Sequence, residues 1–97
     1  IYTGFKPAWV MHKRTDSAEN WVISDNKRIG INPIAYSLLA NSTYQEESSQ
    51  NYLDYLSNGF KHRSTNGRHN ASGGTYIYMA FAEHPFVSSK GVPTTAR

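Results

Sequence analysis

Apolar and polar residues alternate with a period of two in several short runs of this chain. In residues 7–14, PAWVMHKR, Trp9 and Met11 fall on one face of an extended strand, and Val10 and His12 fall on the other. A polar, turn-prone segment at 15–20 separates this run from a second one at 21–28, WVISDNKR. The pattern predicts two strands joined as a hairpin with a longer loop.

The middle of the chain predicts a second hairpin. Residues 52–56 alternate and lead into Ser57-Asn58-Gly59, after which the run 60–64 forms the returning strand. Asn-Gly predicts a type I′ turn, because its central residues tolerate positive φ. Residues 34–40, IAYSLLA, fit either a short strand or one helical turn, and we favour a strand. The segment 65–74, TNGRHNASGG, holds Asn-Gly and Gly-Gly pairs and is expected to be a mobile, exposed loop.

Residues 75–82 are apolar or amphipathic on both faces, which is typical of a central strand covered on each side. One face carries Thr75, Ile77, Met79 and Phe81, and the other carries Tyr76, Tyr78, Ala80 and Ala82. A two-layer fold covers only one face of each sheet, so the other face needs an adjoining domain, another subunit or the C-terminal segment. We expect the Tyr/Ala face to dock against such a neighbour, since Tyr supplies contact area and Ala permits close approach. Alternatively, Tyr76 and Tyr78 cap the edge of the core with their hydroxyls in water.

These patterns predict the fold class. No helix-period stripe appears, and six to seven short strands separated by Gly- and Asn-marked turns predict an all-β fold, either an antiparallel β-sandwich or a jelly-roll-like barrel. We expect a β-sandwich module over residues 1–87 and an extended C-terminal arm over residues 88–97. Aromatic residues make up 13% of the chain, which argues against disorder.

Charge and composition exclude several partners. The net charge is +3, but the basic residues are scattered in small groups. They could line a nucleic-acid groove, yet solvated strand ends are the commoner role, so no nucleic-acid partner is expected. No run reaches the roughly 18 apolar residues of a membrane helix, so no membrane insertion is expected. The chain has no cysteine, which excludes disulfides and thiolate metal sites.

No catalytic motif is recognisable. The four histidines, His12, His62, His69 and His84, lack the spacing of helical zinc motifs, and no Gly-rich phosphate loop leads from a strand into a helix. Most carboxylates lie in or beside loops, and Asp54 and Glu83 on strands are expected to pair with Lys or Arg. We therefore expect no enzyme activity, no metal site and no cofactor.

The loops at 42–55 and 64–74 are rich in Tyr, Ser, Asn, Gly and His, a composition shared with antibody-like binding loops. Tyrosine rings stack on sugars, and Asn, His and Arg hydrogen-bond to hydroxyl groups. This composition either predicts recognition of a specific ligand or serves solubility alone.

Several motifs occur in a recognisable order: GFKPAWVMHKRTD, WVISDNKR, LLANST, LSNGFKHRST and NASGGTYIYMAFAEHPF. Over nearly the whole chain they resemble a domain of unknown function that recurs in bacteriophage tail-fibre and tail-associated proteins. The resemblance implies a non-enzymatic structural module of the virion that acts outside the host cell, in host attachment or fibre assembly. It also implies a homotrimer, because fibres usually have that symmetry.

The sequence departs from the pattern of that family at positions where aliphatic or small residues would be expected. The departures are His12, Ser24, Tyr44, Gln45, His62, Arg68 and His69. We expect a ligand-binding surface for a host glycan or protein receptor at His12, Tyr44, Gln45, His62, Arg68 and His69. The alternative function is a monomeric carbohydrate-binding module.

Overall fold

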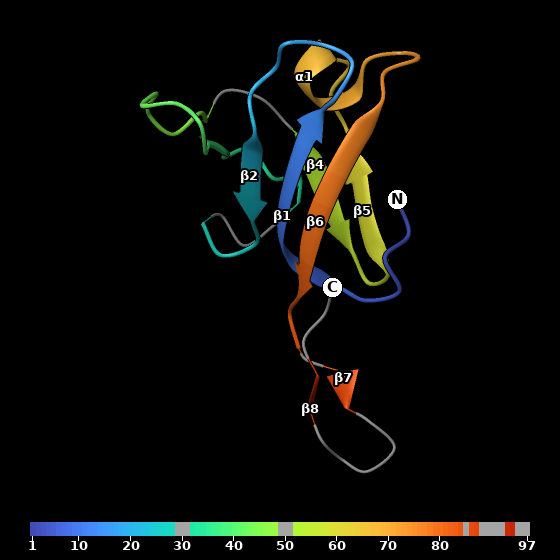
Figure 1. Cartoon of the computed structure of the whole chain (residues 1–97). Helices are drawn as coiled ribbons and strands as arrows, with labels where there is room; N and C mark the ends of the chain where they lie inside the picture. The colour runs from blue at the N-terminus through green and yellow to red at the C-terminus, as the bar shows by residue number, and fades with distance from the viewer. Residues whose placement is uncertain (29–31, 49–51, 85, 88–92, 95–97) are drawn as a thin grey trace.

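The computed structural model describes residues 1–28, 32–48, 52–84, 86–87 and 93–94 (Figure 1). These residues are mostly extended, which confirms the all-β prediction. The elements are β1 (Pro7–Arg14), β2 (Val22–Asp25), β3 (Leu38–Leu39), β4 (Leu53–Leu56), β5 (Gly59–His62), α1 (Gly67–Asn70), β6 (Tyr76–Ala82), β7 (Phe86–Val87) and β8 (Pro93–Thr94).

The front layer is a four-stranded antiparallel sheet in the order β3-β2-β1-β6. The predicted hairpin of β1 and β2 is confirmed, with Met11 opposite Ile23. On its other side β1 pairs along its length with β6, where Met11 lies opposite Met79. β1 is therefore a central strand of this layer.

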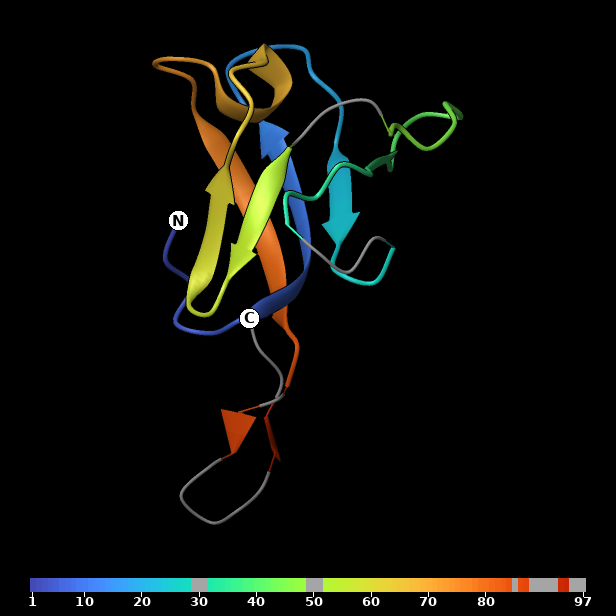
Figure 2. The ribbon, with the colours of Figure 1, turned by 180° about the vertical axis from the view of Figure 1, so that it is seen from behind.

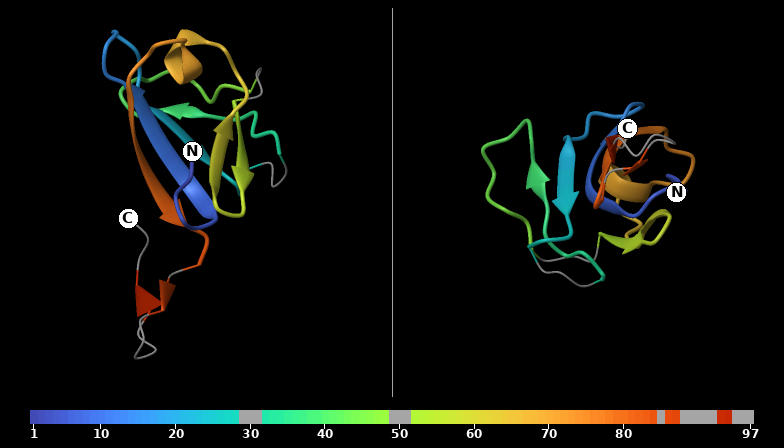
Figure 3. Two further views of the ribbon diagram at one scale, coloured as in Figure 1. Left: turned by 90° about the vertical axis from the view of Figure 1, so that its right-hand side faces the viewer. Right: turned by 90° about the horizontal axis from the view of Figure 1, so that it is seen from below.

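The back layer is the β4–β5 hairpin, which lies behind β1 and β6 in Figure 1 and faces the viewer when the molecule is turned around (Figure 2). The start of the chain extends this layer, because Ile1 and Phe60 exchange backbone hydrogen bonds and Tyr2 bridges to Gly59. On the other side of the hairpin, Ile34 bridges to Leu53. The two layers face each other in a sandwich-like arrangement (Figure 3).

The core lies between these layers. The alternation in β1 places Val10 and His12 inside, while Trp9 and Met11 point outward. The sequence pattern predicted these two faces but not which of them is buried. The apolar core consists of Phe5, Val10, Ile34, Leu53, Tyr55, Phe60 and Ala80, with Ala82 packed against it.

The turn of the β4–β5 hairpin differs from the prediction. The hairpin forms, but Ser57 and Asn58 both have negative φ, so the turn is not type I′. Gly59 is needed here for space rather than for positive φ. A Cβ on Gly59 would lie 1.9 Å from the carbonyl oxygen of Ile1, which crosses directly over it.

β6 also differs from the prediction. It is an edge strand of the front layer, not a central one. Its Tyr/Ala face looks into the molecule, where Ala80 is buried and the ring of Tyr78 meets the ring of Phe60. Its opposite face carries the exposed Ile77, Met79 and Phe81, and Tyr78 on the Tyr/Ala face is also partly open to solvent. An uncharged strand that is apolar on both faces predicts a central position from sequence alone. The sequence does not show whether the rest of the chain covers its second face.

Residues 65–74 form the expected exposed loop only in part, at 65–66 and 71–74. They contain the short helix α1, whose first turn is capped by Asn66: its side chain accepts a hydrogen bond from Arg68 N and its carbonyl accepts from His69 N. Asn-Gly here supplies a helix cap instead of a turn. In residues 34–40, a strand forms only at β3.

The predicted arm at 88–97 lies mostly outside the described residues. Within it, β8 pairs with β7 in a small antiparallel ladder.

Candidate functional site

The structure divides the predicted ligand-binding residues into two groups. The buried His12 and His69 come together with the half-buried His62. Tyr44 and Arg68 instead line a surface cavity beside this cluster, and Gln45 is exposed on the same loop as Tyr44.

The three histidines form a cluster between the layers, beneath α1. His12 points inward from β1, His62 from the end of β5 and His69 from α1. The His12 ring lies 5.0 Å from the His62 ring and 5.2 Å from the His69 ring, centroid to centroid. His69 also packs on Tyr52 at 4.5 Å. The cluster thus joins both layers and the helix.

Burial keeps these imidazoles neutral. Desolvation lowers the pKa of His12 to about 3, and the neighbouring His62, His69 and Arg68 add to this effect. Desolvation likewise lowers the pKa of His69 to about 4, and burial lowers the pKa of His62. At neutral pH the cluster is uncharged.

His12 and His69 are almost completely buried, so they do not present a surface to a ligand. The sequence placed His62 and His69 beside a basic loop, where a histidine is ordinarily exposed. The only sequence signal compatible with burial is that the alternation in β1 puts His12 on the same face as the apolar Val10. Among the described residues, no group of three or more His, Cys, Asp or Glu is arranged to hold a metal ion.

A cavity of about 270 Å³ opens next to α1, and we call it the Arg68 cavity. Its lining combines one aromatic ring with charged, amide and hydroxyl groups. The lining residues are Asn20, Leu39, Ser42, Tyr44, Glu47 and Arg68.

The charged wall of the Arg68 cavity is fixed by a hydrogen-bond network. Nη1 of Arg68 donates to both carboxylate oxygens of Glu47, at 2.9 Å each. The same carboxylate accepts from the buried Ser37 hydroxyl at 3.2 Å and from the Tyr52 hydroxyl at 3.4 Å. Since Ser37 and Glu47 also exchange two backbone hydrogen bonds, Glu47 is held at both its main chain and its side chain.

The loop that carries Tyr44 is tied to Trp21, the residue just before β2. Ala40 N donates to Trp21 O, and Trp21 N donates to the side chain of Asn41. Tyr44 N donates to the hydroxyl of Ser42, which shapes the turn below the ring. The Tyr44 side chain remains 60% exposed. The cavity therefore combines a held polar wall with a free aromatic ring.

A second cavity, of about 360 Å³, lies near the other end of the sheet around Glu83. Glu83 accepts hydrogen bonds from Asn26 at 2.7 Å and from Lys27 at 2.9 Å, and Asp54 pairs with Arg63, so both carboxylates have the expected basic partners. Asp54 lies on β4 as expected, whereas Glu83 lies just beyond the end of β6 and not on a strand. The ring that lines this second cavity, Tyr55, is buried. The second cavity therefore offers no exposed aromatic face on which a ligand could stack.

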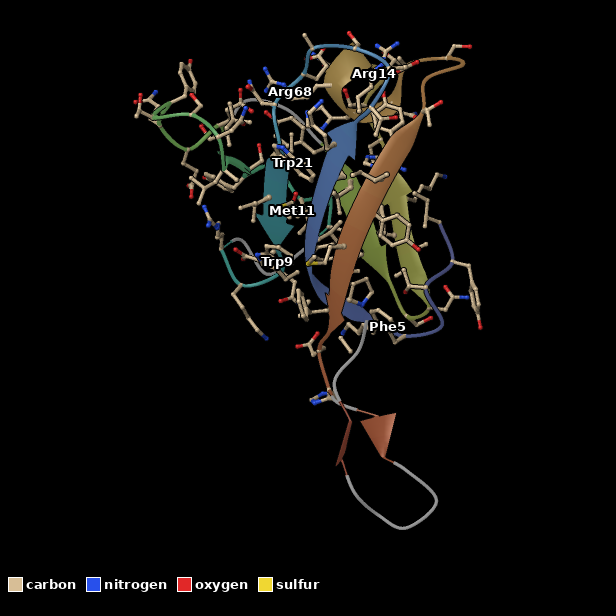
Figure 4. The ribbon with its side chains drawn as sticks, in the orientation of Figure 1. Phe5, Trp9, Met11, Arg14, Trp21 and Arg68 are labelled. Carbon is tan, nitrogen blue, oxygen red and sulfur yellow. The ribbon has the colours of Figure 1, made fainter. Side chains whose placement is uncertain are left out.

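Five apolar residues lie on the outward side of β1 and β6, and we call them the outer face: Trp9, Met11, Ile77, Met79 and Phe81. Trp9, Met11 and Trp21 lie on this side in front of β1 and β2 (Figure 4). The Trp9 ring meets Phe81 of β6 at 5.3 Å. The face predicted to dock, Tyr76 to Ala82, instead contributes Ala80 to the core, so the exposed apolar surface is the opposite one.

Comparison with known proteins identifies the family. The family model described as domain of unknown function DUF7483 matches residues 1–85, and the chain belongs to this family. No curated protein and no solved structure matches the chain. Within the described residues, no helix is long and apolar enough to cross a membrane.

Proposed function

We propose that this member of the DUF7483 family is a non-enzymatic attachment module that binds a surface glycan in the Arg68 cavity. Its motifs resemble modules of bacteriophage tail fibres, which supports a role in host attachment from the virion. The observation that carries the proposal is the pairing of an exposed Tyr44 ring with the fixed Arg68–Glu47 wall in one cavity.

Sugar recognition needs both of these elements. A pyranose presents C–H groups on one face and hydroxyls around its rim. The Tyr44 ring offers an apolar stacking surface at low entropic cost. Arg68, Glu47, Asn20 and Ser42 supply donors and acceptors for hydroxyls. Because Arg68 and Glu47 neutralise each other, a neutral hexose suits this cavity better than a charged sugar.

A glycan array probed with the chain tests the proposal, followed by calorimetric titration with a neutral oligosaccharide that binds. Tyr44→Ala is expected to weaken binding at least about tenfold, which corresponds to ~1.4 kcal/mol. Tyr2→Ala is the matched control, since Tyr2 is also an exposed tyrosine, at 76%, but belongs to the back layer. It should leave affinity unchanged.

Two results would contradict the proposal: an array with no glycan bound above background, or equal affinities for Tyr44→Ala and the wild type. Because Tyr44 is exposed, its removal should not alter the melting temperature, so loss of binding cannot be ascribed to unfolding.

A further inference from the structure

Among the described residues, half of the eight large apolar side chains that are exposed lie on β6. Ile77 and Met79 are each 49% exposed and Phe81 is 44% exposed. Tyr78, which points to the other side, is 47% exposed. Monomeric proteins rarely leave so many large apolar side chains on one strand open to water.

The backbone of β6 is open as well. β6 pairs with β1 on one side, and among the described residues no strand pairs with its other side. Its register with β1 is uninterrupted from Tyr76 to Phe81, and the irregularity lies beyond, between Pro7 and Trp9 of β1. An edge of this length without charge or Pro is a template for another strand.

We propose that β6 pairs with β6 of a second copy of this chain, antiparallel and centred on Met79. The two front layers then join into one continuous sheet across a twofold axis. This inference concerns a surface apart from the Arg68 cavity and does not depend on the glycan proposal.

The sequence of β6 favours a second copy over another partner because the strand is complementary to itself. In an antiparallel pair centred on Met79, Met79 faces its own copy, Ile77 faces Phe81 and Tyr78 faces Ala80. Apolar residues therefore meet apolar residues on the outer face, and a large ring meets a small methyl on the inner face. No residue from 76 to 82 is charged, so the symmetric pair brings no like charges together.

The pairing also extends the outer face. Trp9 and Met11 lie beside Phe81 and Met79 in the sheet. Joining two front layers makes this apolar row continuous between the two copies. A twofold axis through a strand pair yields a dimer with the same surface used by both subunits.

The proposal is tested by measuring the molar mass of designed variants, using light scattering after size-exclusion chromatography over a range of chain concentrations. The variants change residues 77 and 81, which face each other in the proposed register. Ile77→Glu and Phe81→Lys should each give monomers, because a charge is then placed against an apolar residue of the partner. The double variant I77E/F81K should recover the dimer, since the carboxylate introduced at position 77 of each copy then faces the ammonium group introduced at position 81 of the other. Leu56→Lys, at an exposed apolar position in the β4–β5 hairpin, is the control and should remain dimeric.

Cross-linking gives a second readout. The chain has no cysteine, so Met79→Cys introduces a single thiol on the expected axis. A short bis-maleimide should link two copies of M79C with high yield and leave L56C without a cross-link. A wild-type monomer at high concentration, a trimer, or a double variant that stays monomeric although its melting temperature matches the wild type would overturn the proposal.

Discussion

His12 Nε2 lies 3.1 Å from His69 Nδ1, and the two rings share a hydrogen bond in the interior although 57 residues separate them in sequence. Nδ1 of His12 and Nδ1 of His62 are buried and have no hydrogen-bond partner among the described residues. The cluster therefore satisfies its polar groups only in part. A proton added to either ring would bring a charge into this interior, where desolvation disfavours it.

The histidine cluster should make the fold sensitive to mild acid. An unfolded histidine titrates near pH 6.5, whereas the folded pKa values of His12 and His69 are about 3 and about 4. Between these limits the unfolded state binds more protons, so the free energy of unfolding falls as pH is lowered below 6.5. The loss is at most about 1.4 kcal/mol per pH unit for each histidine. Urea unfolding at pH 7.5, 6.5, 5.5 and 4.5 measures it.

His69→Phe provides the comparison, because it keeps a ring of similar size and removes one titrating group. The slope of unfolding free energy against pH should therefore become less steep between pH 4.5 and 6. The decrease corresponds to at most one fewer proton bound on unfolding. His84→Gln is the matched control, because it removes an exposed histidine that lies outside the cluster. The carboxyl groups of Asp16 and Glu83 have lowered pKa values. Their effect on the free energy of unfolding therefore falls at lower pH than that of the histidines. Equal slopes in wild type and His69→Phe would contradict this account.

Tyr76→Phe should loosen α1 without disturbing β6. The Tyr76 hydroxyl donates to Gly67 O at 2.6 Å and accepts from Ala71 N at 2.8 Å, so one side chain holds both ends of the helix. Loss of two hydrogen bonds should cost about 1–3 kcal/mol of unfolding free energy. Hydrogen exchange should rise at residues 67–71 and remain unchanged in β1. Uniform protection in both proteins would show that α1 does not depend on this hydroxyl.

Gly59→Ala tests the close approach of the chain start to β5. The added Cβ would overlap the carbonyl oxygen of Ile1, which accepts a hydrogen bond from Phe60 N. The overlap involves backbone, so residues 1–3 must separate from the hairpin. We expect a loss of about 1–3 kcal/mol, typical of an overpacked site. Thermal unfolding measures the loss, and an unchanged melting temperature would contradict the observed approach.

Arg68→Lys tests the fixed wall of the proposed glycan site. Lysine keeps the positive charge but cannot direct one planar nitrogen to both oxygens of Glu47. We expect glycan binding to weaken several-fold, while stability decreases by no more than about 2 kcal/mol. Calorimetry and urea unfolding of the same samples separate the two effects. Unchanged affinity would show that the position of Glu47 does not matter for the ligand.

The sequence was most informative where alternation and burial agree. Period-two patterns predicted that Val10 and Trp9 lie on opposite faces of β1, and they predicted the β1–β2 and β4–β5 hairpins. The turn type was not predictable. Glycine is required at position 59 because the backbone of Ile1 passes over it, and this contact joins segments that are far apart in the sequence.

The site was predictable only in part. Tyr44 and Arg68 were singled out as departures from a family pattern, and they do line one cavity. Their partner Glu47 was not recognised, since it stands in a polar run without periodicity and is positioned by the distant Ser37. The burial of His69 depends on α1, whose cap at Asn66 resembles a loop signal in the sequence alone.

The pairing of β1 with β6 has a consequence for how the molecule is made. Pro7 lies opposite Ala82, so the main ladder joins segments from opposite ends of the matched family region. Such non-local pairing is slow, because a large loop must close before any contact in the ladder forms. During synthesis β1 is made early, and it stays unpaired on this side until β6 has been made. We expect the pairing of β1 with β6 to be the rate-limiting step of folding.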